Sequence, residues 1–264
     1  MRGVNRTLRV LRALNVRNGA TVVELSRDTG ISRPALYRVL ESLREEGYVA
    51  LDLAQRHYCL TLLVRGLAEG FTDEDWVSEV ARPVLRGLQR IVLWPVDLGT
   101  FMDNAMWIRE TTRPASTLTI DRGVVGIRFP MLLSATGRAY LAWCPADERE
   151  QVIENLVAGR ETGIDRLDRM QIDALLEETR ERGYGVRFGE EPVESGAIAV
   201  PILAKERVMG CVNLTFIRRG MTPQSVADRC LNDLQRGAAE IAAGALLLEV
   251  DHRTAGVQYL VHAS

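Results

Sequence analysis

Residues 32–38 of the sequence, SRPALYR, place charged and hydrogen-bonding side chains at short intervals. Arg33, Tyr37 and Arg38 carry guanidinium and phenol groups, and Ser32 adds a hydroxyl. On a helix, positions four residues apart share one face. Guanidinium groups bind phosphate oxygens and the hydrogen-bond acceptors of guanine. This spacing therefore predicts a helical surface that contacts a polyanion.

The positive charge of the chain is concentrated at its start. Residues 1–60 contain ten arginines and six acidic residues, a net charge of +4, whereas the whole chain of 264 residues carries −2. The remainder is therefore at −6. A basic head on an acidic body suits a polyanionic partner at one end. A solvated arginine-rich face without any partner would give the same composition.

Composition and spacing exclude several classes of protein. The length predicts two domains, at about 100 to 200 residues per domain. Neither the histidines nor the cysteines have the spacing of a metal site or a redox motif. No apolar run is long enough to span a bilayer, and no signal-type segment opens the chain. We therefore predict a cytoplasmic protein without metal, cofactor or membrane contact, with reduced thiols at Cys59, Cys144, Cys211 and Cys230.

Three helices are predicted to position residues 32–38. The apolar residues of the first helix share one face: Val4, Leu8, Leu11 and Leu14. The segment RNGA at 17–20 ends that helix, and a short second helix runs from Val22 to Gly30, where glycine can adopt the positive φ of a tight turn.

The third helix is predicted to begin at Ser32 as its N-cap, with Pro34 in the first turn. Its apolar stripe comprises Leu36, Val39, Leu40 and Leu43. Arg33, Tyr37 and Arg38 lie opposite this stripe. Two helices joined at Gly30 form a helix-turn-helix, whose second helix fits the roughly 12 Å major groove of DNA.

Residues 48–61 alternate in polarity on both sides of the polar segment DLAQR. This pattern predicts a β-hairpin beside the third helix, a wing, with Arg56 at its tip. Arg56 and Arg6 would contact phosphates only. A plain three-helix bundle with no role in DNA binding is the alternative.

The rest of the chain predicts an antiparallel sheet with helices. Strand-like runs occur at 96–101, 106–110, 116–120, 196–204 and 208–216. Helical segments occur at 134–143, 146–158 and 166–182, and a final helix begins at Thr222 and Pro223. The start of the helix at 134–143, SATG, could bind a carboxylate through unpaired N–H groups, because Ala135 and Gly137 are small. From the residues alone, an ordinary capped helix is the favoured interpretation.

The chain resembles the IclR family of bacterial transcriptional regulators in an ordered set of segments that covers nearly its whole length: TGISRPALYRVLESLREEGYV, TLLVRGLAEGF, VARPVLRGL, RFPMLLSATGRAYLAWCP, ERGYGVRFGEE and GAIAVPILAKERVMGCVNLTF. Within the family, the segments FTDEDWVSEVARP, RETT and IAVPI are most similar to the branch that controls degradation of hydroxyphenylpropionate and related aromatic acids.

The resemblance implies an α+β protein. It comprises a winged helix-turn-helix domain at 1–60, a linker helix at 61–78, a GAF-like effector-binding domain with an antiparallel sheet at 79–250 and a tail at 251–264. The implied partners are a roughly palindromic double-stranded operator, a small carboxylate effector, a second copy or a dimer of dimers, and RNA polymerase if the protein activates transcription. The exposed apolar residues expected to support dimerisation are Leu62, Leu63 and Leu67.

The resemblance also favours an effector pocket at SATG. The implied ligand-binding residues are Met131, Ser134, Ala135, Thr136, Gly137, Cys211, Asn213 and Thr215. Phe129 or Trp107 would line the apolar remainder. Two departures limit this transfer. Pro34 and Ala35 replace a frequent Ser-Thr pair, so the operator sequence does not carry over, and a short loop leaves Glu190, Glu191 and Glu194 without an assigned role.

Two other functions stay open at this point. An enzyme would need a base near Ser134 or a cysteine, but the histidines lie in the wing and near the end of the chain. Glu190 and Glu191 would be the remaining acid and base pair, on opposite sides of a strand. Alternatively, the basic head binds a protein instead of DNA. Binding to DNA depends steeply on salt, and this dependence separates the two.

Overall fold

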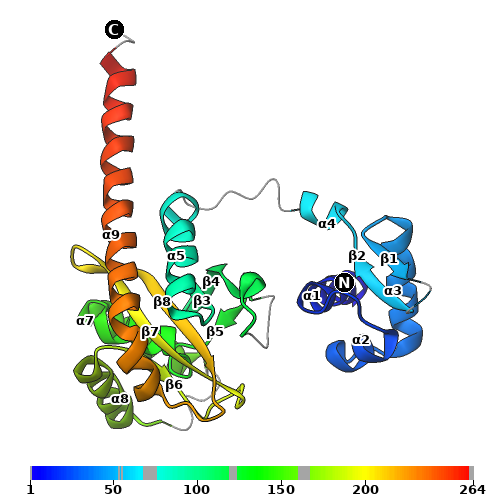
Figure 1. Cartoon of the computed structure of the whole chain (residues 1–264), viewed down its shortest axis with the longest axis horizontal. Helices are drawn as coiled ribbons and strands as arrows, with labels where there is room; N and C mark the ends of the chain where they lie inside the picture. Colours follow the sequence, from blue (N-terminus) through cyan, green and yellow to red (C-terminus); the bar gives the residue numbers. More distant parts are fainter. Residues whose placement is uncertain are drawn as a thin grey trace. The chain divides into compact units, whose positions relative to one another are not determined.

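The computed structural model describes residues 2–52, 54, 56–67, 76–118, 124–159 and 167–261, and the side chains of residues 3–248 within those ranges. The chain divides into two compact units (Figure 1), Met1–Asp73 with Asp121–Gly123 and Glu74–Ile120 with Val124–Ser264. We call them the head and the C-terminal unit, and each is described by itself.

The head consists of helices and a two-stranded wing. Its elements are α1 (Arg2–Val16), α2 (Val22–Thr29), α3 (Arg33–Glu45), β1 (Val49–Asp52), β2 (His57–Leu60) and α4 (Leu63–Gly66). Strands β1 and β2 pair antiparallel, with Val49 opposite Leu60 and Asp52 opposite His57. The predicted helix-turn-helix and wing are both present.

Local signals explain the boundaries of α2 and α3. The hydroxyl of Thr21 accepts a hydrogen bond from the Glu24 N–H at 3.3 Å, and the Glu24 carboxylate accepts one from the Thr21 N–H at 2.8 Å. This capping box satisfies two backbone donors at the start of α2. Gly30 ends α2 with φ 65°. Ser32 is the N-cap of α3, but its side chain makes no capping hydrogen bond.

The apolar face predicted for the first helix is partly wrong. Leu14 is fully buried, but Val4 and Leu8 are 66% and 48% exposed, and Val10 takes a core position instead. Only the second half of α1 therefore packs against the head core, with Leu25 and other residues of α2 and α3.

The linker helix predicted at 61–78 is described only at its two ends. Helix α4 covers Leu63–Gly66, and a π-helix, η1, spans Trp76–Ala81. The predicted segment between residues 67 and 76 lies outside the described residues. Leu62, Leu63 and Leu67 are exposed, at 75%, 55% and 60%.

The C-terminal unit contains a six-stranded antiparallel sheet in the order β5-β4-β3-β8-β7-β6. Its strands are β3 (Val96–Met102), β4 (Ala105–Thr111), β5 (Arg128–Phe129), β6 (Gly185–Arg187), β7 (Ser195–Ala204) and β8 (Arg207–Ile217). Its helices are α5 (Arg82–Val92), the 3-10 turn η2 (Arg113–Ala115), α6 (Ala135–Trp143), α7 (Ala146–Ala158), α8 (Arg169–Arg182) and α9 (Pro223–Val261).

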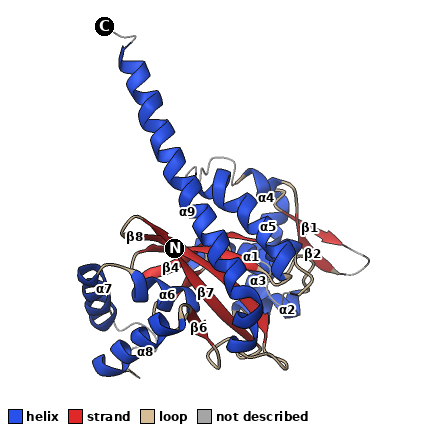
Figure 2. Ribbon diagram, turned by 60° about the vertical axis from the view of Figure 1, so that its left-hand side comes forward, coloured by secondary structure: helices blue, strands red, loops and turns tan. Residues whose placement is uncertain are grey.

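The sheet separates two apolar cores because its side chains alternate between its faces. Leu98, Val200 and Leu214 pack with residues of α5 and α9. On the other face, Ala199 and Cys211 pack with residues of α6, α7 and α8. The first core fixes α5 and α9 beside each other, and α9 continues past the sheet (Figure 2).

Two details of the sheet differ from the sequence analysis. The strand predicted at 116–120 is absent from its described part, since residues 116–118 are irregular and 119–120 lie outside the described residues. The edge strands β5 and β6 were not anticipated. They have 2 and 3 residues, too few to show a period of two.

Helix α9 has 39 residues. The Thr222 hydroxyl accepts a hydrogen bond from the Ser225 N–H at 3.2 Å, as expected of an N-cap. The helix continues without a break past residue 250, where the C-terminal tail was predicted to begin. Within the described ranges, none of the helices combines the length and apolarity needed to cross a bilayer.

Candidate functional site

The outer face of α3 presents the residues predicted to bind a polyanion. Ser32, Arg33 and Arg38 are exposed, and Tyr37 is 55% exposed. The opposite face is anchored by Leu36 and other fully buried residues. Among the described residues, no hydrogen bond or ion pair engages the guanidinium of Arg33 or Arg38. Both groups are therefore available to a partner.

Several other arginines of the head are engaged within the head itself. Arg9 donates a hydrogen bond to the Thr29 carbonyl. Arg17 lies 3.4 Å from the Glu24 carboxylate, and Arg44 lies 2.8 Å from a carboxylate on its own helix. Arg6 is exposed on α1. The arginines of the head thus differ: some are engaged within the described part of the head, and others, including Arg33 and Arg38 of α3, are not.

The wing is tied to the helices by backbone bonds. Ala20, just before α2, forms a bridge with Tyr58 of β2, through N–H to carbonyl hydrogen bonds of 3.2 and 2.8 Å. The Asn18 side chain accepts a hydrogen bond from the Leu60 N–H at 2.8 Å. Arg56, exposed beside β2, has a positive φ of 55°. The wing and α2 therefore form one structural piece.

The start of α6 is capped as predicted. The Ser134 hydroxyl accepts a hydrogen bond from the Gly137 N–H at 3.0 Å and donates one to the Pro130 carbonyl at 2.6 Å. Residues 134–142 are all buried. One of the N–H groups expected to bind a carboxylate is thus already paired within the protein.

Glycine allows close packing around the start of α6. A Cβ added to Gly137 would lie 2.1 Å from the Met131 carbonyl oxygen. A Cβ added to Gly185 of β6 would lie 2.2 Å from the Ala135 carbonyl oxygen. Met131 itself is fully buried in the core. The start of α6 is therefore held tightly between the preceding loop and β6.

Cys211 faces α6, and its thiol lies 3.4 Å from the Thr136 carbonyl oxygen. Burial raises the pKa of Cys211 well above its ordinary value. It also raises the pKa of Cys144 to about 11. Both thiols therefore stay protonated and inert at neutral pH. Within the described residues, no group of three or more His, Cys, Asp or Glu side chains could hold a metal ion.

Asn213 and Thr215 belong to a buried polar cluster that the sequence analysis missed. Asp97 and Arg113 form a two-pronged ion pair with N to O distances of 3.1 and 2.9 Å. The Asn213 amide donates to Asp97 at 3.0 Å, and Arg113 donates to the Thr215 hydroxyl at 2.8 Å. Asp97 and Arg113 are 1% and 6% exposed. The sequence did offer one sign of this cluster, because Asp97 is an acidic residue inside the apolar run VDLGTF.

Two further buried arginines lie near this cluster. Arg138 of α6 pairs with Glu190 at 2.6 Å. Arg187 of β6 donates to three backbone carbonyls and to the Ser195 hydroxyl at 2.8 Å. Burial lowers the pKa of Arg187, Glu190 opposes that shift, and Arg113 adds to it. Arg138 is paired and Arg113 is paired, whereas Arg187 contacts neutral oxygens.

The acidic loop does not form the strand assumed for an acid and base pair. Residues 189–194 are irregular, so Glu190 and Glu191 do not lie on opposite sides of a strand. Glu191 and Glu194 are exposed. Burial acts to raise the pKa of Glu190, but the charge and hydrogen bond of Arg138 lower it overall. Glu190 is thus held as a carboxylate and is a poor general base.

The remaining predicted pocket residues fall in two groups. Phe129 is half-buried and packs in the core beside α6, together with Ala135. Trp107 is half-buried, and its indole N–H donates to the Met102 carbonyl at 3.0 Å. The start of α6 and the Asp97–Arg113 cluster lie on the same face of the sheet, since Cys211, Asn213 and Thr215 alternate along β8.

An exposed cationic helix on a helix-turn-helix, with a wing beside it, is the architecture of a DNA-binding regulator. The helix-turn-helix domain model of the IclR family matches residues 3–53, and the model of the C-terminal domain of bacterial IclR transcriptional regulators matches residues 71–243. The chain belongs to the IclR family and is a DNA-binding transcriptional regulator.

The chain is similar to a known regulator in sequence and to two solved structures in fold. The regulator KdgR of Escherichia coli is 28% identical over 195 residues, which are 73% of each chain. An IclR transcriptional regulator from Alicyclobacillus acidocaldarius has a similar structure, with 24% identity, a TM-score of 0.58 and coverage of 92% of this chain and 98% of that one. An IclR homologue from Microbacterium hydrocarbonoxydans, in complex with 4-hydroxybenzoate, has 21% identity, a TM-score of 0.56 and coverage of 91% and 98%.

Proposed function

We propose that this regulator binds a roughly palindromic operator as a homodimer or dimer of dimers, in the cytoplasm where its DNA target lies, and responds to a small carboxylate held in the C-terminal unit. The guanidiniums of Arg33 and Arg38 on α3 carry the first part, because both are exposed and have no partner in the described part of the chain. Half-sites about one helical turn apart, near 34 Å, would admit two copies of α3.

Each exposed group of the head has a different role in this proposal. Arg33, Tyr37 and Arg38 reach base edges and phosphates from α3, with Ser32 at its start. Arg6 and Arg56 contact phosphates and set orientation without reading sequence. Pro34 is exposed but has no hydroxyl, and Ala35 is buried in the head core, so discrimination between bases falls to the arginines and Tyr37.

A gel-shift titration of the full chain against its own promoter region tests the docking. Arg38→Ala should weaken binding about 10- to 100-fold, as expected for loss of a base contact worth about 1–3 kcal/mol. Arg44→Ala is the matched control, since Arg44 lies on the same helix but already pairs with Glu41. It should bind the operator more tightly than Arg38→Ala does. Equal affinity of the wild type and Arg38→Ala would refute the docking.

Salt dependence separates DNA from a protein partner of the head. Log affinity for the operator should fall linearly with log salt, because each neutralised phosphate releases a counterion. A flat response would favour a protein partner and would contradict the assignment of α3 to a DNA groove.

The charge balance of the buried cluster supports an anionic effector. Three buried arginines share two carboxylates: Asp97 pairs with Arg113, and the Glu190 carboxylate pairs with Arg138 and also acts on Arg187 without a hydrogen bond to it. An excess of buried positive charge is costly, and a carboxylate near Arg187 would relieve that cost. The 4-hydroxybenzoate bound to the Microbacterium hydrocarbonoxydans homologue supports an aromatic acid as the class to test first.

The ligand site in this proposal includes the residues around the start of α6 and those of β8. Those residues are Met131, Ser134, Ala135, Thr136, Gly137, Cys211, Asn213 and Thr215. Since the start of α6 is tightly packed, the acid would bind toward Asn213, Thr215 and Arg187. Its binding would act on the head through the segment that joins the two units, and no catalytic step is involved.

Calorimetry with and without operator tests the coupling. Because linkage is reciprocal, an acid that changes operator affinity must show an equally changed affinity of its own in the presence of operator, by about 1–3 kcal/mol. A thermal-shift screen of small aromatic and aliphatic carboxylates supplies the ligand. Equal ligand affinity in both titrations would remove the regulatory part of the proposal and leave DNA binding intact.

A further inference from the structure

Residues 110–113 contact two different parts of the C-terminal unit. They comprise the last two residues of β4, Thr112 and the first residue of η2. Some of their side chains belong to the buried polar cluster, and one forms an ion pair with α5. We call residues 110–113 the connecting segment.

One side of the connecting segment is bonded to the buried polar cluster. The Thr111 hydroxyl donates a hydrogen bond to the Asp97 carboxylate at 2.6 Å. Arg113 donates to the same carboxylate at 3.1 and 2.9 Å and to the Thr215 hydroxyl at 2.8 Å. Asp97 is 1% exposed, and charge-assisted hydrogen bonds are strong where little water screens them. A displacement of Asp97 or Arg113 therefore also displaces this segment.

The other side of the connecting segment is bonded to α5. Glu110 lies opposite Leu98 of β3, which packs in the core with α5 and α9. Thr111 lies opposite Asp97. Because neighbouring side chains of a strand point to opposite faces, Glu110 lies on the α5 side of the sheet and Thr111 on the cluster side. The Glu110 carboxylate accepts a hydrogen bond from Arg82 Nε at 2.5 Å. Adjacent residues thus join the two faces of the sheet.

The Arg82–Glu110 pair is stronger than an ordinary surface ion pair because it is partly buried. The side chain of Glu110 is 17% exposed, and that of Arg82 is 36% exposed. Surface pairs contribute little because water and salt screen the charges, and this screening is weaker for a partly buried carboxylate. Separating the pair would leave the Glu110 charge poorly solvated. A movement of Glu110 therefore draws α5 along with it.

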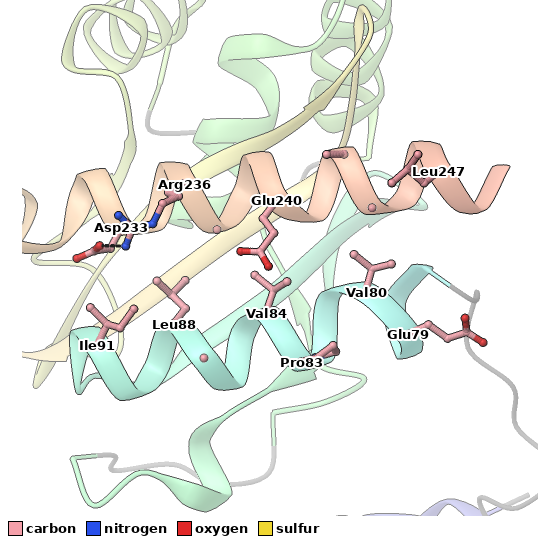
Figure 3. Close-up of a pocket in the computed structure, with 14 residues that line it drawn as sticks. Glu79, Val80, Pro83, Val84, Leu88, Ile91, Asp233, Arg236, Glu240 and Leu247 are labelled. Atoms are coloured by element: carbon pink, nitrogen blue, oxygen red, sulfur yellow. Dashed lines mark hydrogen bonds and ion pairs between the residues drawn. The ribbon is translucent and has the colours of Figure 1, made fainter. Parts of the chain in front are cut away.

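Arg82 lies where the C-terminal unit begins. It is the first residue of α5, and η1 precedes it directly, at the first described residues of this unit. Val80 of η1 and Val84 of α5 both point toward α9 (Figure 3). This contact is close, since a Cβ added to Gly244 of α9 would lie 2.5 Å from Val80. We expect η1 and α5 to move together, and their movement reaches the segment that joins the two units.

We propose that the Arg82–Glu110 pair transmits the binding of an acid from the buried polar cluster to the start of α5. Both are positioning residues, which contact neither the acid nor the operator. This inference rests on the proposed response to a carboxylate, and it names the route by which that response leaves the C-terminal unit. An acid shifts such an equilibrium only through contacts that differ between the two states.

The two states differ in the partner of Arg113. Without acid, its guanidinium binds Asp97 through two nitrogens. An acid bound toward Thr215 attracts the same guanidinium, because one fork of donors then serves two carboxylates. Asp97 remains bonded to Thr111, so the end of β4 shifts with it. Glu110 shifts as part of the same strand and draws α5 along.

Gel-shift titrations of the full chain with and without 4-hydroxybenzoate, and then with the other carboxylates that the chain binds, test this route. In the wild type, the acid should change operator affinity about 5- to 150-fold, the usual range of coupling. In Arg82→Met and in Glu110→Gln, the change should fall below about 2-fold, because the acid no longer moves α5. Arg86→Met, at an exposed position one turn further along α5, is the control and should keep the wild-type response.

Calorimetry and a charge swap separate transmission from folding and binding. Without operator, Arg82→Met and Glu110→Gln should bind the acid as tightly as the wild type, and without acid they should bind the operator as tightly. Arg82→Glu combined with Glu110→Arg reverses the ion pair and should restore the response, whereas Arg82→Glu alone should not. Circular dichroism checks that each variant is folded.

The outcomes distinguish this route from the proposed function. A wild-type response that persists in either Arg82→Met or Glu110→Gln would overturn the route and leave the effector response intact. So would loss of acid binding in either variant, or a charge swap that binds both partners without responding. A wild type that binds none of the acids, or whose operator affinity ignores those it binds, would overturn the effector response and this route together.

Discussion

Arginine is used in opposite ways in the two units of this chain. On α3, Arg33 and Arg38 are exposed and have no partner within the described residues. In the C-terminal unit, Arg113 and Arg187 are each 6% exposed, and each makes several hydrogen bonds. An exposed guanidinium costs little stability and is free for a partner, whereas a buried one is retained only when its surroundings compensate it. Exposure and pairing, more than residue type, thus separate a recognition surface from an internal network.

The largest expected effect is on the buried side of this comparison. Asp97→Asn leaves Arg113 buried without its counterion, which should lower the free energy of unfolding by about 3–5 kcal/mol. All four tryptophans lie in the C-terminal unit, so their fluorescence in a denaturant titration reports that unit. Arg33→Ala, on the exposed side, should stay within about 0.5 kcal/mol of the wild type when far-UV circular dichroism follows the unfolding of the helical head. Equal unfolding midpoints for both variants would show that the buried Asp97–Arg113 pair contributes no more to stability than the exposed Arg33.

The next effect concerns packing around the start of α6. Gly137→Ala introduces a Cβ 2.1 Å from the Met131 carbonyl oxygen, and overpacking of this kind costs about 1–3 kcal/mol. Gly87→Ala is the matched control, since its Cβ meets no atom within 4 Å. It should stabilise α5 by about 0.5–1 kcal/mol, because alanine favours helix over glycine. A stabilising Gly137→Ala would contradict the close packing of Gly137 against Met131.

A smaller effect is expected on operator binding when the exposed arginines outside α3 are replaced. Arg56→Ala and Arg6→Ala should each weaken operator binding equally for all sequences and reduce the slope of log affinity against log salt by about 1. Competition with unrelated DNA of the same length measures the sequence dependence. Discrimination between operator and competitor should stay unchanged, and a changed ratio would place these residues on bases instead of phosphates.

The smallest effect depends on pH. The folded-state pKa of Glu190 is lowered from its ordinary value of 4.5, because Arg138 stabilises the carboxylate. Its contribution to stability is therefore present above that value and is lost as the pH falls below it. Glu190→Gln should therefore flatten the stability profile below about pH 4.5 and leave its shape near neutrality unchanged. Thermal unfolding from pH 3 to pH 7 measures this, and identical acid slopes would show that Arg138 does not stabilise the charged form.

Sequence reasoning predicted the head well because its signals are local. The Gly30 turn, Pro34 and the three- to four-residue spacing of Leu36, Leu40 and Leu43 each constrain the backbone within one or two turns. The start of α1 was misjudged for a different reason. Val4 and Leu8 have the spacing of a buried helical face. Spacing alone does not show whether another element of the head packs against that part of α1.

The buried polar cluster of the C-terminal unit was less predictable because its contacts join distant residues. Asp97 and Asn213 meet only through the pairing of β3 with β8, and Arg138 meets Glu190 across a loop. The residues next to each member of such a pair do not indicate its distant partner. The small residues of SATG show the same limit, since Gly137 serves a close approach to Met131 that spacing alone cannot distinguish from room for a ligand.

The close contact between α6 and β6 restricts how the C-terminal unit can change shape. With the Ala135 carbonyl pressed against Gly185, and the Met131 backbone against Gly137, the first turn of α6 cannot slide along the sheet without collision. Helix α6 could therefore not shift alone. A conformational change that begins there has to move α6, the loop at Met131 and the edge strand β6 together as one rigid body.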